Sequence, residues 1–158
     1  MSQLSSQQLK VFVPARDYAL SQRFYRALGF VQEDEVGNVT CFRHGTHCAF
    51  LLQDFYLREL AENLMLHLWV DDADSWWQHV HDAGLDAQFA VTCSVPEDRP
   101  WGARDFTLHD PSGVLWHRPS TVDVNRESGT GNCKGGHGAC FKRFPIPESP
   151  FPALKRLR

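Results

Sequence analysis

The stretch LKVFVPARDYALSQRFYRALGF, residues 9–30, contains the pattern of one complete strand–helix unit. An apolar strand is followed by Asp17, a residue type that caps helix N-termini, and Gly29 marks the end of the helix. The apolar residues between them recur at the spacing that buries one face of a helix; they are Tyr18, Leu20, Phe24, Tyr25 and Leu28. This stretch therefore predicts a strand followed by an amphipathic helix.

The same pattern returns in LMLHLWVDDADSWWQHVHDAGL, residues 64–85. A shift of 55 residues along the chain places Asp17 on Asp72 and Gly29 on Gly84. The second helix also has an apolar stripe, which consists of Ala73, Trp76, Val80 and Ala83. A fixed period of this kind indicates an internal structural repeat.

Strand and turn signals follow each strand–helix unit, which gives the order βαβββ twice and predicts an α+β fold. In the second half the expected strands are residues 87–95, 103–109 and 114–118, with the turn Asp-Pro-Ser-Gly before the last. We expect a first module over residues 1–63, with a short helical or loop connector at 54–63, and a second module over residues 64–119. The helices should cover one face of each sheet.

The composition excludes several classes of protein. Residues 1–119 carry nine Lys and Arg against sixteen Asp and Glu, so this body is acidic and predicts no binding to nucleic acid. No apolar run is long enough for a membrane span, and the first residues lack a secretion signal. The five cysteines form no tight framework, so we expect a cytoplasmic protein with reduced thiols.

Residues 120–158 differ from the rest of the chain because they are rich in Gly and Pro and carry net positive charge. They predict an extension that is partly disordered or packs across a partner subunit; a shifted reading frame or a cloning remnant would have the same composition. Cys133, His137 and Cys140 have a spacing that can bind zinc, but a fourth ligand is missing.

Three stretches together resemble the vicinal oxygen chelate superfamily, which includes glyoxalase I, extradiol dioxygenases, fosfomycin-resistance enzymes and bleomycin-resistance proteins. They are FVPARDYALSQRFYRALGF (12–30), LHLWVDDADSWWQHVHDAGL (66–85) and PWGARDFTLHDPSGVLWH (100–117). The bleomycin-resistance branch is the most similar, because EDRPWGARDF precedes DPSG. The resemblance implies paired βαβββ modules whose mixed sheets curl around a cavity, and a homodimer.

Metal-dependent members of this superfamily use up to four ligands, and the resemblance places these at Lys10, within residues 49–52, at Met65 and at His117. A protonated lysine has no lone pair, a thioether binds hard divalent ions poorly, and Ala-Phe-Leu-Leu at 49–52 offers no ligand. We therefore expect no metal cofactor. His67 lies two residues beyond Met65, so a register shifted by two would let His67 and His117 face each other as candidate ligands of a divalent metal.

Strand alternation predicts which side chains line the cavity. Leu66, Leu68 and Val70 should pack under the helix, and the intervening residues should face the cavity. The residues expected to contact a ligand are Phe12, Met65, His67, Trp69, Trp101, Arg104 and His117. An apolar, aromatic cavity with a few polar groups suits a flat organic compound. Core or dimer-interface packing is an equally good interpretation of Phe12 and Trp69. For His67, a structural hydrogen bond is a more common role than ligand binding or catalysis.

These observations favour a protein that binds a small molecule over an enzyme. The expected function is sequestration of a bulky aromatic or glycopeptide-like compound without turnover, by a cytoplasmic homodimer that binds neither nucleic acid nor membranes. The alternative is a metal-dependent lyase, isomerase, dioxygenase or thiol transferase of the same superfamily, in which the metal acts as a Lewis acid. Metal-free catalysis with His67 or His117 as general base is a third possibility.

Overall fold

The structure is a computed structural model that describes residue 4 and residues 6–122. Its first half contains β1 (Phe12–Pro14), α1 (Tyr18–Ala27), β2 (Val31–Val36), β3 (Val39–His44) and β4 (Cys48–Gln53). The connector contains the short helix α2 (Arg58–Ala61). The second half contains β5 (Met65–His67), α3 (Ala73–Asp82), α4 (Leu85–Phe89), β6 (Glu97–Asp98), β7 (Ala103–His109) and β8 (Leu115–Thr121).

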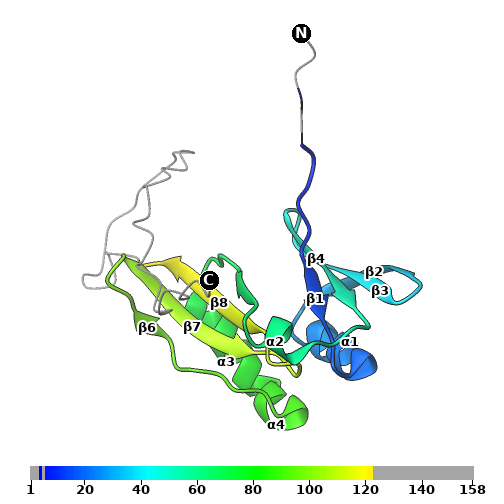
Figure 1. The fold of residues 1–158 in the computed structure, drawn as a ribbon. Coiled ribbons are helices and arrows are strands. Elements are labelled where there is room, and N and C mark those ends of the chain that lie inside the picture. The colour runs from blue at the N-terminus through cyan, green and yellow to red at the C-terminus, as the bar shows by residue number, and fades with distance from the viewer. Residues whose placement is uncertain (1–3, 5, 123–158) are drawn as a thin grey trace, which may run out of the picture. The chain divides into compact units, whose positions relative to one another are not determined.

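The strands form two four-stranded mixed sheets of the same topology, which confirms the predicted α+β fold (Figure 1). The first sheet has the order β1-β4-β3-β2 and the second the order β5-β8-β7-β6. In each sheet one pair of neighbouring strands is parallel, β1 with β4 in the first sheet and β5 with β8 in the second. The other pairs are antiparallel. The internal repeat seen in the sequence is therefore a repeat of the whole βαβββ unit, which we call the first and the second module.

The two long helices begin and end where the repeat predicts. The Asp17 carboxylate accepts a hydrogen bond from the Leu20 backbone N–H at 2.9 Å, and Asp72 accepts one from the Asp74 N–H at 2.9 Å. These contacts satisfy amide groups that have no partner inside the helix. Gly29 follows α1 with φ +103°, a backbone conformation that residues with a Cβ rarely adopt. The helix therefore stops there and the chain enters β2.

The two modules share one hydrophobic core under their helices. Phe24 of α1 packs edge-on against Phe89 of α4, with 5.4 Å between ring centroids. Tyr25 of α1 is fully buried, and its hydroxyl donates a 2.6 Å hydrogen bond to the Asp110 carboxylate in the turn before β8. Because Asp110 also accepts from the Ser112 and Val114 N–H groups, this turn of the second module is held to a helix of the first.

The predicted strand over residues 87–95 is wrong. Gly84 adopts a left-handed conformation, and the chain then makes the helix α4 up to Phe89. Leu85 and Phe89 are both buried, so one turn of helix places two large side chains on the shared core. The chain reaches the sheet again at Cys93, which bridges to Leu108, and at the short β6.

The described part of the chain has no helix that is both long and apolar enough to cross a membrane. The last strand, β8, continues to Thr121, because Ser120 and Thr121 still pair with Arg104 and Ala103. The expectations for the extension, including the zinc pattern of Cys133, His137 and Cys140, fall outside the described residues.

Candidate ligand-binding face

The side of the second sheet that faces away from its helix carries the candidate site, and we call it the open face of the second sheet. Exposure alternates along β5 and the residues after it as expected, because Leu68 and Val70 are buried whereas Met65, His67 and Trp69 are exposed. The same alternation places Val114 and Trp116 in the core. The open face includes Met65, His67, Trp69, Asp105, Thr107, His109, Leu115 and His117.

His67 and His117 lie next to each other on this face. They are register partners on the parallel strands β5 and β8, and their ring centroids are 6.4 Å apart with 31° between the ring planes. The Trp69 ring lies 5.9 Å from the His67 ring at a similar tilt of 34°. Trp69, His67 and His117 therefore form a continuous row of rings.

A buried carboxylate orients His117. Its Nδ1 lies 2.8 Å from Oδ2 of Asp105, a residue that is only 1% exposed, while the other Asp105 oxygen accepts the Arg118 backbone N–H at 3.0 Å. An ionised carboxylate can only accept hydrogen bonds, so Nδ1 of His117 carries the proton. In neutral His117, Nε2 therefore keeps its lone pair. Arg99 contributes a positive charge, with its Nε 3.8 Å from the same carboxylate oxygen.

Burial lowers the pKa of His67, and the neighbouring His117 lowers it further, whereas Asp105 acts in the opposite direction. The charged form of His67 is disfavoured because the ring has lost water and because a second cation beside it would repel it. At neutral pH the open face consequently presents neutral His67 next to the oriented ring of His117.

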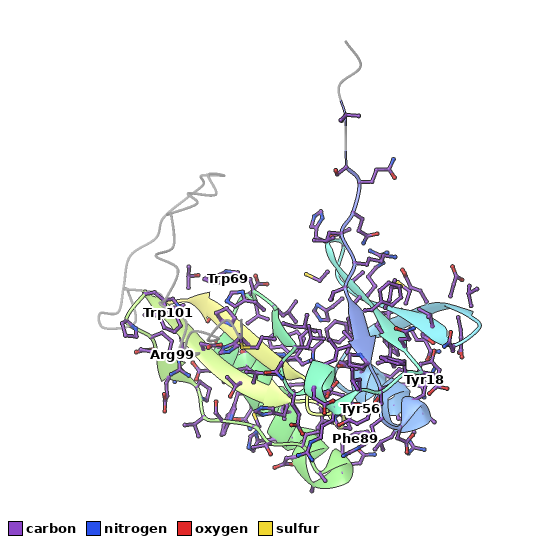
Figure 2. The ribbon with its side chains drawn as sticks, in the orientation of Figure 1. Tyr18, Tyr56, Trp69, Phe89, Arg99 and Trp101 are labelled. Carbon is purple, nitrogen blue, oxygen red and sulfur yellow. The ribbon has the colours of Figure 1, made fainter. Side chains whose placement is uncertain are left out.

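One further aromatic side chain, Trp101, and one guanidinium, that of Arg99, lie toward the same end of the second sheet as Trp69 (Figure 2). Trp69 and Trp101 are 43% and 40% exposed, which leaves ring surface available for contact. Trp101 lies in the turn before β7, where Arg99 N–H and Ala103 C=O form a hydrogen bond. Sequence analysis named both tryptophans and missed Arg99 and Asp105.

Phe12, the remaining apolar candidate, lies in the first sheet and not beside the histidines. It pairs with Leu51 and is 53% exposed. The polar groups near it form a chain from Lys10 Nζ to Cys41 Sγ (3.3 Å) and from Cys41 to the Glu33 carboxylate (3.2 Å). Arg43 also pairs with Glu33, and this pairing is the main reason that the pKa of Glu33 is lowered.

Arg104 lies on the side of the second sheet that faces α3. Its guanidinium makes two hydrogen bonds to the Asp74 carboxylate, at 2.6 and 2.9 Å, and one to Asp98 at 2.9 Å. These contacts raise the pKa of Arg104. Its expected role as a ligand contact stays a prediction, and any ligand would have to compete with two carboxylates.

The positions that hold the metal in metal-dependent relatives do not fit a resident ion in this chain. Lys10 donates to Cys41, residues 49–52 offer no ligand atoms, and Met65 offers only a thioether. Among the residues that the structure describes, no group of three or more His, Cys, Asp and Glu side chains is arranged to hold a metal ion. His67 and His117 remain as a pair of donors.

The side chain of Arg118 was not singled out by sequence analysis, and it is completely buried between the second sheet and α3. Its guanidinium lies 5.2, 5.4 and 5.8 Å from the rings of Trp76, Trp116 and Phe106, and its three nitrogens have no hydrogen-bond partner among the described residues. Burial lowers its pKa to about 10. Strand alternation from Trp116 could have placed it on the buried side.

A pocket of about 340 Å³ lies on the helix side of the molecule, away from the open face. His44 and Trp76 line it, and their rings pack against each other with centroids 4.9 Å apart. Its other lining residues are Leu28, Gly29, Ser75 and His79. His79 already contacts the Ala27 carbonyl at 3.2 Å. This pocket contains none of the residues expected to bind a ligand.

Solved structures share this arrangement of sheets and helices. A bleomycin resistance determinant encoded on the transposon Tn5 is 21% identical, with a TM-score of 0.62, and covers 74% of this chain and 99% of its own. A bleomycin-binding protein from Streptomyces verticillus, solved with copper(II)-bleomycin, is 18% identical, with a TM-score of 0.63 and coverage of 75% and 98%. TnmS3, an antibiotic-binding protein from a Streptomyces species, is 22% identical, with a TM-score of 0.61 and coverage of 75% and 99%.

No curated protein sequence matches the chain significantly. A family model does match: the model described as the Glyoxalase/Bleomycin resistance protein/Dioxygenase superfamily covers residues 7–117. This range spans both modules, from the segment before β1 to His117 in β8. The chain therefore belongs to the Glyoxalase/Bleomycin resistance protein/Dioxygenase superfamily.

Proposed function

We propose that this protein binds a bulky, partly aromatic or glycopeptide-like compound on the open face of its second sheet and sequesters it without turnover. The observation that carries the proposal is the row of Trp69, His67 and His117 rings on a face that none of the described helices covers. Exposed rings at this spacing offer a flat compound a stacking surface together with hydrogen-bonding nitrogens. Structural relatives that bind bleomycin or another antibiotic support the same class of ligand.

The working form in this proposal is a cytoplasmic homodimer. Phe12 and Met65, each more than half exposed on the open sides of the two sheets, are apolar residues that a second copy would cover. Burial between subunits would also exclude water from the bound compound. Cross-linking, or light scattering at several protein concentrations, tests the dimer independently of the ligand.

Fluorescence titration with metal-free bleomycin tests the binding function, because the chain has five tryptophans. We expect saturable quenching and recovery of chemically unchanged drug. Trp69→Ala should weaken binding by about twofold to tenfold, which corresponds to the roughly 0.5–1.5 kcal/mol of an aromatic stacking contact. Trp77→Phe on α3 is the matched control and should leave the affinity unchanged.

Two results would contradict this proposal. Absence of saturable binding would exclude bleomycin as a representative ligand. Release of an altered drug would identify an enzyme. If turnover also vanished in Asp105→Asn, His117 oriented by Asp105 would be its general base, since a positioned imidazole is the common proton acceptor in such sites.

A further inference from the structure

We propose that His67 and His117 together bind a divalent transition-metal chelate, meaning a ligand that brings its own metal ion with two open coordination positions. The inference rests on the proposed function, because it names the chemistry that the open face of the second sheet selects. It concerns a metal that arrives with the ligand, and it differs from a resident ion held by four protein ligands.

The geometry of the pair suits coordination of one ion. With metal–nitrogen bonds of about 2.0–2.1 Å, two imidazoles on one metal have centroids about 4.5–6.5 Å apart, from the cis to the trans arrangement. The observed separation of His67 and His117 is 6.4 Å, the value of the trans arrangement, so a chelate whose open positions are cis requires the rings to approach each other by about 2 Å. Because His67 is exposed, we expect its side chain to make this approach by rotation while both strands stay in place.

The hydrogen bond between His117 and Asp105 also suits coordination. The Asp105 carboxylate accepts a hydrogen bond from Nδ1 of His117, which leaves Nε2 of His117 as a metal donor with a fixed orientation. A carboxylate behind a ligating imidazole fixes the ring and raises its basicity, an arrangement common in metal sites. The ring of His67 lies beside His117 and provides the second nitrogen donor.

Two nitrogen donors are too few for a resident ion, because catalytic zinc usually takes three protein ligands and structural zinc four. Within the described residues no third His, Cys, Asp or Glu side chain completes the set. Asp105 is buried and both its oxygens are engaged. The remaining coordination positions must therefore come from the ligand, whose organic part has the Trp69 ring beside His67 to pack on.

Imidazole nitrogen suits Cu²⁺, Ni²⁺ and Zn²⁺, and Cu²⁺ binds most strongly of the three. The probe is accordingly copper(II)–nitrilotriacetate, a chelate with open positions, added to the full chain near neutral pH. Calorimetry measures affinity and stoichiometry, and electron paramagnetic resonance reports how many imidazole nitrogens coordinate the copper. We expect one equivalent per chain and coordination by two imidazoles.

Variants locate the site. His67→Gln and His117→Gln should each abolish two-imidazole coordination and lose more affinity than Asp105→Asn, which we expect to cost about tenfold because it only removes the orienting carboxylate. His109→Gln is the matched control, since His109 is also exposed on β7, two residues from Thr107, the register partner of His117. Thermal unfolding of each variant shows that the fold is kept.

Equal chelate binding by the wild type and the double variant His67→Gln/His117→Gln would overturn the inference. Binding of free Cu²⁺ but not of the chelate would overturn it too, because the ion would then have protein ligands enough of its own. Metal-free bleomycin separates this failure from failure of the proposed function. If the drug binds and the chelate does not, the metal-chelate inference is wrong and the proposed binding function stands. If the chelate binds and the drug does not, bleomycin is excluded as a representative ligand and the metal-chelate inference stands.

Discussion

The two modules have the same strand order but different chemistry on their open sides. Phe12 pairs with Leu51 in the first sheet as His67 pairs with His117 in the second, and Phe12 and His67 are related by the 55-residue repeat. By the same pairing, Val39 occupies in β3 the place that Asp105 occupies in β7. Three apolar residues in one module thus correspond to the carboxylate and two histidines of the other.

The buried sides differ in one corresponding pair. Leu52 follows Leu51 on β4, as Arg118 follows His117 on β8, and both side chains are completely buried. In the first module this position contributes an apolar side chain to the core. In the second it places a guanidinium among three aromatic rings.

The repeat constrains the backbone of both modules and leaves the residues on their open sheet faces free to differ. Caps, glycines and apolar stripes keep the same places in both modules because each helix must begin, end and bury one face. A face that no helix covers carries no such requirement, so its residues can change without loss of the fold. Polar residues that suit ligand binding can therefore lie on the open face of one module only.

Transfer of the histidine pair to the first module is the prediction with the largest expected effect. Phe12→His combined with Leu51→His should create a second binding equivalent for copper(II)–nitrilotriacetate, because the two positions are register partners on parallel strands. Calorimetry measures the stoichiometry. Phe12→His alone is the control and should add none, and a double variant that folds yet stays at one equivalent would show that the modules are not geometrically equivalent.

Replacement of Arg118 by leucine, the residue type that Leu52 provides at the corresponding position of the first module, should have the next largest effect. Arg118→Leu is expected to raise the free energy of unfolding by about 1–3 kcal/mol, because a buried charge with no hydrogen-bond partner among the described residues is replaced by an apolar side chain. Chemical denaturation measures the change. Arg104→Leu is the matched control and should destabilise the protein instead, since it leaves Asp74 and Asp98 without their cation.

The pH dependence gives a second readout of Arg118. Its pKa in the folded state is about 10, below the ordinary value of 12.5, so above about pH 10 the unfolded chain binds more protons than the folded one. Wild-type stability should therefore gain a contribution from Arg118 as the pH rises through this window, and Arg118→Leu should lack it. A variant less stable than the wild type would mean that the aromatic rings outweigh the cost of burying the charge.

The smallest effect concerns the titration of His67. Its pKa lies below the ordinary value chiefly because of burial and secondly because of His117. His117→Gln should consequently raise this pKa only in part, as followed by NMR. His109→Gln should leave it in place. If His117→Gln left it unchanged as well, the two rings would not interact electrostatically and the pair would have to lie farther apart.

The pKa of His67 also affects stability in a defined direction. Because the value is lowered in the folded state, the unfolded imidazole is protonated first as the pH falls through about 6.5. Titration of His67 therefore leaves the stability of the fold unchanged well above that pH and lowers it as the pH falls below about 6.5.

Much of the fold could be predicted from the sequence because the signals are local. Asp17 and Asp72 cap helices as expected, and Asp110 stabilises its own turn by accepting hydrogen bonds from the Ser112 and Val114 amides. The error over residues 87–95 arose from the same kind of signal. Apolar residues such as Leu85 and Phe89 can be buried on a helical turn as well as on a strand. In the structure they lie on a helical turn, and Phe89 packs against Phe24 of α1.

The candidate site was predicted only in part. Alternation alone placed Met65, His67 and Trp69 on one side of the sheet, as the structure has them. The contact of Asp105 with His117 joins two strands and depends on their register, which the sequence did not provide. Arg99 and Arg118 were missed for a similar reason, because their partners come from other elements.

The sequence alone was enough to predict the repeated strand–helix unit, the boundaries of the two long helices and the facing of β5 and β8, because these follow from periodicity and capping within a few neighbouring residues. The tertiary structure was needed to show that β5 lies beside β8 in the register that brings His67 next to His117. It also decided that Asp105 is buried behind them and that Arg118 lies among aromatic rings. These contacts join residues far apart in the chain, where strand pairing and core packing, and not local preference, set the distances.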